Sequence, residues 1–87
     1  MLIRSSDKTV VVNFNRIDCL QVEEIGNGYR IAAYNGESVT SLGEYSLREK
    51  AVDVLDEICN SYQYLRECQV TRAGVTQPGF VFCVSEE

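Results

Sequence analysis

The segment that most constrains the fold is residues 46–65, in which apolar side chains recur at spacings of three and four. Ser46 and Glu49 have the spacing of a capping box, in which each side chain bonds a backbone amide of the first helical turn. We therefore expect an amphipathic helix from Leu47 which, if it continues to Glu67, is about 30 Å long. The side chains expected on its buried face are Leu47, Ala51, Val54, Leu55, Ile58, Tyr62 and Leu65.

Most of the remaining chain is typical of short strands. Residues 9–14 are rich in β-branched side chains, which favour a strand. Residues 19–25 alternate apolar and polar side chains, as a strand with one solvated face does. The other strand candidates before the helix are residues 2–4, 29–34 and 37–45.

Two glycine-containing turns order three of these strands. Gly26-Asn27-Gly28 ends the strand at residues 19–25, and Asn35-Gly36 ends the strand at residues 29–34. Asn-Gly suits a type I′ hairpin, because both central residues of that turn need positive φ. Strands joined by tight turns are antiparallel neighbours, so we expect three adjacent strands between residues 19 and 45.

The last strand candidate, residues 80–84, leaves its pairing open. It follows residues 68–79, which are expected to form a loop with at most a short strand at Val70. Its pattern is compatible with pairing to residues 2–4, to residues 10–14, or to another copy of the chain through an open edge. The sequence predicts a single α+β domain, residues 1–87: an antiparallel β-meander sheet of about five or six strands with the helix packed across one face.

Charge and composition narrow the classes of function. The net charge is −5, and the six arginines are scattered singly rather than gathered as a phosphate-binding footprint, so direct nucleic-acid binding is not expected. The start of the chain has no signal-peptide pattern, and no apolar run approaches the roughly 20 residues of a membrane span. We therefore expect a cytoplasmic domain that does not enter a membrane.

The cysteines predict neither a metal site nor an active site. Cys19, Cys59, Cys68 and Cys83 include no C-x-x-C pair, and the chain contains no His. In the cytosol these thiols are expected to stay reduced, as core or half-buried residues. Without a His beside a thiol, the usual cysteine nucleophile is missing, so we expect no catalytic residue, no metal and no cofactor.

The aromatic side chains are the candidates for an interaction surface. Tyr29 and Tyr34 have opposite parity on one strand, so at least one of them is expected at the surface. Tyr64 lies off the apolar face of the helix, and the last strand candidate contributes two phenylalanines. Because Tyr is enriched at protein interfaces, the predicted surface is Tyr29, Tyr34, Tyr64, Phe80 and Phe82.

Residues 43–58 resemble a pattern in small uncharacterised phage and prophage-type proteins of Firmicute bacteria. In that group the pattern runs roughly Gly-x-Tyr-x-Ser-x-Glu-x-Ala, followed by an amphipathic helix with Leu and Ile. Those proteins also open with a segment like Met-Leu-Ile-Arg-Ser, and an Asn follows a β-branched strand as Asn13 does here. The resemblance spans residues 1–65. It implies a prophage or mobile-element setting and supplies no active site.

These observations favour a small non-enzymatic interaction or accessory domain, which binds a protein partner or a second copy through a sheet edge or face. The alternative is an acidic phage-encoded inhibitor that mimics nucleic acid. Its carboxylates would come from Glu23, Asp53, Asp56, Glu57, Glu86 and Glu87. An enzyme with thiol or carboxylate chemistry is the third class. It is disfavoured because Glu23-Glu24 and Asp56-Glu57 are consecutive pairs, whose side chains diverge on a strand or a helix.

Overall fold

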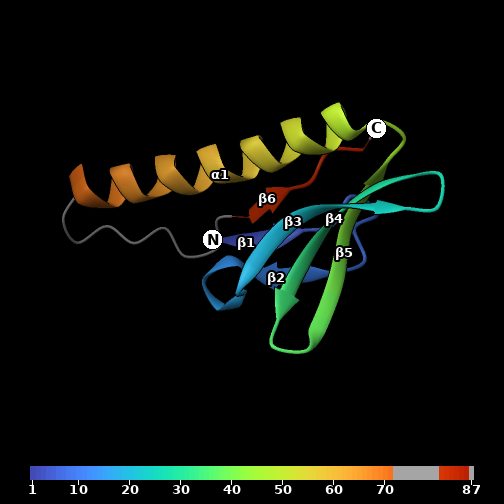
Figure 1. The fold of residues 1–87 in the computed structure, drawn as a ribbon. Helices are drawn as coiled ribbons and strands as arrows, with labels where there is room; N and C mark the ends of the chain where they lie inside the picture. The colour runs from blue at the N-terminus through green and yellow to red at the C-terminus, as the bar shows by residue number, and fades with distance from the viewer. Residues whose placement is uncertain (72–80, 87) are drawn as a thin grey trace.

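The computed structural model describes residues 1–71 and 81–86, and for residues 64–71 it describes the backbone only. The described residues form six strands and one long helix, which Figure 1 labels. In chain order these are β1 (Leu2–Arg4), β2 (Val11–Asn13), the 3-10 turn η1 (Phe14–Arg16), β3 (Cys19–Ile25), β4 (Gly28–Asn35), β5 (Ser38–Tyr45), α1 (Arg48–Thr71) and β6 (Val81–Cys83).

The strands form two three-stranded sheets, so the prediction of one continuous meander sheet is wrong. The meander expected between residues 19 and 45 is confirmed as the antiparallel sheet β3-β4-β5. The second sheet has the order β2-β1-β6, with β2 antiparallel and β6 parallel to β1. β6 joins this sheet after the long helical excursion, the kind of crossover that a parallel pair needs.

The break between the sheets lies at η1. The chain leaves β2 through this 3-10 turn instead of a hairpin, and the Asn13 side chain accepts a hydrogen bond from the Asn15 amide at 3.0 Å. Because η1 redirects the chain, β3 begins a new sheet instead of pairing with β2. The strand predicted for residues 9–14 is therefore shorter than its β-branched composition suggested.

Both hairpins of the meander have glycine at the first central position of the turn. Gly26 has φ 39° and Gly36 has φ 60°, while neither Asn27 nor Glu37 has positive φ. Positive φ at the first central residue alone is the pattern of a type II′ turn, so the predicted type I′ turn at Asn35-Gly36 is wrong.

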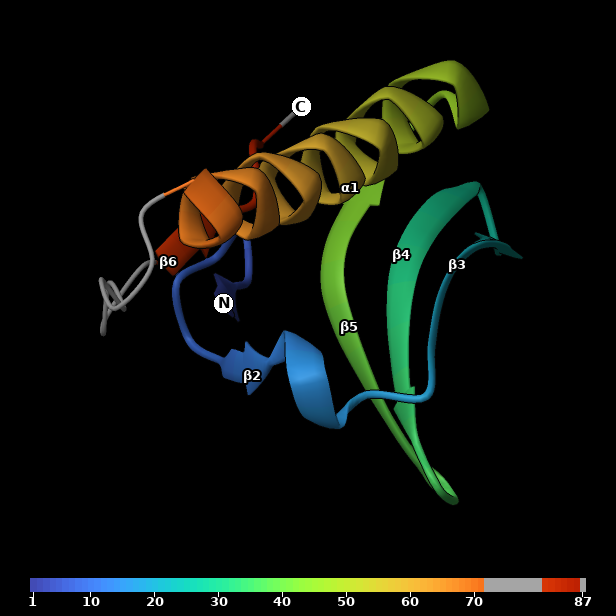
Figure 2. The ribbon, with the colours of Figure 1, turned by 90° about the vertical axis from the view of Figure 1, so that its left-hand side faces the viewer.

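One hydrophobic core joins α1 to both sheets. In Figure 2 the helix lies along one side of the molecule, with β4 and β5 curving away from it. The core cluster combines Ile3 of β1, Ile31 of β4 and Val54 and Ile58 of α1, all fully buried. Within the described residues, no helix is both long and apolar enough to cross a membrane.

The buried stripe of α1 agrees with its sequence pattern except at the start. Ala51, Val54 and Ile58 have no exposed surface, and Leu55 packs partly buried against them. Leu47 is 63% exposed, because the helix begins at Arg48 and Leu47 lies just before it. Tyr62 packs against Phe14 of η1 with ring centroids 4.5 Å apart, and Leu65 lies outside the described side chains.

A bulge in β5 connects the two sheets. Ile31 is opposite Gly43 while Ala32 is opposite Ser41, so Leu42 is an extra residue on β5. Its side chain is fully buried, and its carbonyl accepts a hydrogen bond from the Ser6 amide at 2.8 Å. The turn after β1 is thereby tied to β5 at this point.

Candidate interaction surface

The outer face of β3-β4-β5 carries a hydrogen-bonded network centred on Glu23. The two-residue turn at Gly26 and Asn27 sets Glu23 opposite Arg30, whose Nη2 and Nε both lie 2.9 Å from Glu23 Oε1. Glu23 Oε2 accepts from Gln21 Nε2 at 2.7 Å and from the Tyr34 hydroxyl. The hydrogen bond from Tyr34, followed by those from Gln21 and Arg30, holds the pKa of the Glu23 carboxyl below its ordinary value.

Tyr34 covers the centre of this face. It lies two rows of the ladder away from Glu23, so its ring must cross the row of Ala32 to reach the carboxylate. Ala32 has no exposed surface although it does not belong to the core cluster. We attribute this burial to the Tyr34 ring, because the bond from Tyr34 to Glu23 spans the row of Ala32.

The structure separates the five aromatic residues predicted for an interaction surface. Tyr34 lies half-buried on the outer face, as just described. Tyr29 and Phe82 are half-buried and pack against the core cluster, which does not favour them as contact residues. The side chains of Tyr64 and Phe80 fall outside the described part of the chain.

The outer face of the second sheet carries apolar side chains beside the polar Arg4 and Asn13. The register places Val11, Leu2 and Val81 on the face opposite the buried Ile3, together with Cys83. Val11 is 52% exposed and Val81 is 40% exposed. The sequence pattern did not predict this face. The buried side of each of these short strands is set by how β1, β2 and β6 pair.

Four strands lie at a sheet edge among the residues that the structure describes, β2 and β6 in one sheet and β3 and β5 in the other. β2 pairs only with β1, and β5 pairs only with β4. Asn35 and Ser38 flank the two-residue turn, so they form a hydrogen-bonded pair of the ladder. Hydrogen-bonded and non-hydrogen-bonded pairs alternate along an antiparallel ladder, so the backbone amide and carbonyl of the next residue, Val39, point away from β4. Since Ser6 bonds the carbonyl of Leu42, the free edge of β5 is residues 38–41.

A cleft of about 220 Å³ opens between the edge strands β2 and β5. Its lining residues belong to β2, to η1 and the residue after it, and to the hairpin end of β4-β5. Figure 2 shows these elements on the side of the molecule away from α1. The residues that line it are Val12, Asn13, Arg16, Ile17, Ala33, Asn35, Ser38 and Thr40. Val12 and Ile17 also pack against the core cluster, which gives the cleft an apolar floor, and Arg16 and the two asparagines are polar groups at its rim.

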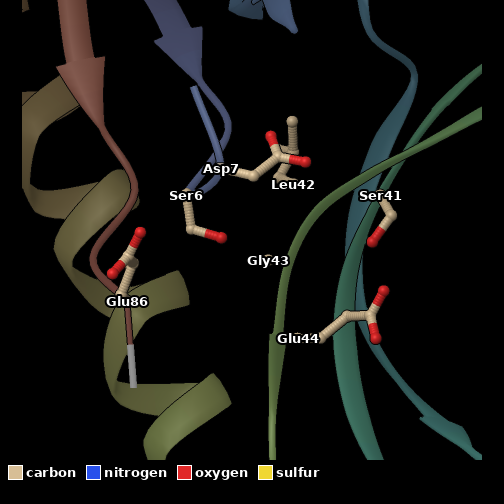
Figure 3. A pocket seen from close by; sticks show the side chains of 7 residues that line it. All are labelled: Ser6, Asp7, Ser41, Leu42, Gly43, Glu44 and Glu86. Atoms are coloured by element: carbon tan, nitrogen blue, oxygen red, sulfur yellow. The ribbon is translucent and has the colours of Figure 1, made fainter. Parts of the chain in front are cut away.

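A second cavity, of about 320 Å³, has an acidic rim. Figure 3 shows Asp7, Glu44 and Glu86 around it, on the turn after β1, on β5 and in the C-terminal tail. Asp7 accepts hydrogen bonds from Ser5 and Thr9, which lower the pKa of its carboxyl to about 2. Among the described residues, no group of three or more potential ligands could hold a metal ion.

A third cavity, of about 440 Å³, opens beside the β3-β4 turn. Ile25, Asn27 and Tyr29 line it on the hairpin side, with Tyr45 and Ser46 between β5 and the helix. Glu44 borders it as well as the acidic cavity, so the two cavities share a negatively charged wall.

Three of the cysteines are more exposed than the sequence predicted. Cys19, Cys59 and Cys83 are free, as expected, but all three are exposed rather than in the core. The side chain of Cys68 lies outside the described residues. Each of the three exposed thiols lies on a different element, β3, α1 or β6.

No family model, no curated protein and no solved structure matches this chain. The function proposed below therefore rests on the geometry described above.

Proposed function

We propose that the domain is a non-enzymatic protein-interaction module, which binds an extended segment of a partner by strand addition to β5. The free edge at residues 38–41 is the observation that carries this proposal. Its outward backbone groups give a partner strand a template for main-chain hydrogen bonds, and the adjoining cleft gives room for a side chain.

β5 suits strand addition better than the other edges do. Its free residues, Ser38 to Ser41, are uncharged and include β-branched Val39 and Thr40. The edge strand β3 is nearly as long as β5 but carries Glu23 and Glu24, and natural edge strands use such charges to prevent pairing. β2 and β6 have three residues each, which is short for a stable added strand.

Binding to β5 can be tested with peptides selected on the full chain from a random library. In an NMR titration, we expect the largest amide shifts at residues 38–41, with slower hydrogen exchange at Val39 once a peptide is bound. Val39→Pro removes an outward N–H that β4 does not use, so it should weaken binding by about tenfold or more while the fold is kept.

Val11→Lys is the matched control, because Val11 is equally exposed but lies on the other sheet. It should leave binding unchanged. If Val39→Pro binds the peptides as tightly as the wild type, or if the shifts cluster away from β5, strand addition at this edge is wrong.

A second copy of the chain is one partner that this edge would accept, by antiparallel pairing of β5 with β5. Sedimentation of the wild type and Val39→Pro distinguishes the two cases. Self-association that the proline abolishes identifies a homodimer, and a wild-type monomer that still binds peptides identifies a partner of another sequence. The resemblance of residues 1–65 to small phage-type proteins supports a partner encoded with a mobile element or by its host.

A further inference from the structure

We infer that the cleft beside β5 receives the C-terminal residue of the partner's strand, with an apolar side chain inside the cleft and the terminal carboxylate at Arg16. This inference rests on the proposed strand addition and names the chemistry of the segment that is added. It draws on the size of the cleft, its charge and its position between two open edges.

The size of the cleft favours a single residue. Its volume of about 220 Å³ lies below the range of roughly 300 to 1,000 Å³ that is typical of small-molecule sites. Val12, Ile17 and Ala33 make its lining apolar on both walls, and Thr40 adds a methyl group from β5. One aliphatic side chain would bury its surface here without displacing the core.

The charge of the cleft favours an anion. Arg16 is the one charged residue among the described residues that line it, whereas the other two cavities are bordered by carboxylates. Arg16 is exposed and has no ion pair or hydrogen bond with any described residue. In a chain of net charge −5, an unpaired guanidinium over an apolar floor complements a carboxylate, which it can bind with two parallel hydrogen bonds.

The asparagines at the rim add donors for the same carboxylate. The Asn13 side chain uses its oxygen to accept from the Asn15 amide, so its NH₂ group remains for a ligand. Asn35 comes from the opposite wall, at the end of β4. A carboxylate between these walls would therefore meet donors from both sheets.

The position of the cleft favours a polypeptide over a free organic acid. β2 supplies Val12 and Asn13 on one side, β5 supplies Ser38 and Thr40 on the other, and each strand has an open edge. Only a backbone can pair with such edges. The cleft lies at the Ser38 end of β5, so a strand whose carboxyl end reaches it must run antiparallel to β5.

The test uses a hexapeptide library with randomised final positions, prepared once with free C-terminal carboxylates and once as C-terminal amides. On the full chain, we expect the free-carboxylate library to select an aliphatic last residue, and amidation of a selected peptide to weaken its binding about tenfold to a hundredfold. Arg16→Gln should cause a similar loss, and Arg16→Lys should restore part of it.

The control is Arg48→Gln, which removes the same charge from an exposed site at the start of α1 and should leave affinity unchanged. Equal affinity for acid and amide, or an equal loss in both arginine variants, overturns the inference. If such peptides still lose binding in Val39→Pro, strand addition stands and only the terminal carboxylate is wrong. If neither library binds at residues 38–41, both proposals fall.

Discussion

The hydroxyl of Tyr45 donates a hydrogen bond of 2.6 Å to the backbone carbonyl of Ser85. Tyr45 ends β5 and Ser85 follows β6, so this bond ties the C-terminal tail to the meander sheet. Together with the bond from the Ser6 amide to the Leu42 carbonyl, it holds the second sheet against β5. The position of β2 relative to β5, and hence the cleft between them, depends on these contacts.

Tyr45→Phe should lower the free energy of unfolding by about 1 kcal/mol, because it leaves the Ser85 carbonyl without its donor while the ring stays buried. Urea unfolding measures this change. Tyr29→Phe is the matched control, since Tyr29 is half-buried on the same face and donates no hydrogen bond among the described residues. Equal losses in the two variants would contradict a structural role for the Tyr45 hydroxyl.

Gly43 makes room for the same ring. A Cβ at this position would lie 2.6 Å from the Tyr45 hydroxyl oxygen and 3.0 Å from the ring carbon that bears it. Gly43→Ala should therefore displace the ring and cost about 1 to 3 kcal/mol of stability. The same substitution should cost less in a Tyr45→Phe background, because phenylalanine lacks the hydroxyl oxygen that lies nearest to the added Cβ. Strictly additive losses in the double variant would count against this contact.

The contrast between the helix and the sheets shows what the sequence could predict. The spacing of Ala51, Val54 and Ile58 identified the buried face of α1, because helical periodicity is a local property. The two turns likewise predicted the order of β3, β4 and β5, but not their register, because the turn residues are Gly26-Asn27 and Gly36-Glu37 and Gly28 and Asn35 belong to β4. These features depend on neighbours in the chain.

The division into two sheets depends on contacts between distant residues. The β-branched run at residues 9–14 carried no sign that η1 would end β2 at Asn13. The parallel pairing of β1 with β6 joins the two ends of the chain, which local patterns do not specify. The cleft could not be predicted for the same reason, since its two walls come from different sheets.

Asp7 makes stability depend on pH in the acid range. Its folded pKa of about 2 lies below the ordinary value of an aspartate, so its contribution is fully present above about pH 4 and is lost as the pH falls toward 2. Asp7→Asn should flatten the fall of the urea midpoint between these pH values. Glu24→Gln, which removes an exposed carboxylate with no hydrogen bond among the described residues, should leave that fall unchanged.

Lys8 has φ 67°, a left-handed conformation that costs a non-glycine residue free energy. Its amide donates to the Ser5 carbonyl at 2.9 Å, and glycine would keep this backbone bond. Lys8→Gly should therefore raise the free energy of unfolding by up to about 1 kcal/mol. Lys50→Gly should lower it by about 1 kcal/mol, because Lys50 lies within α1. A loss of stability in both variants would contradict strain at Lys8.

The most direct test of the central claim is hydrogen exchange at the amides of Val39 and Ser41, measured with and without a selected peptide. The account predicts that both amides, which point away from β4 and have no described partner, become protected when the peptide adds a strand to β5. If these two amides exchange as fast with saturating peptide as they do in the free protein, the account is contradicted.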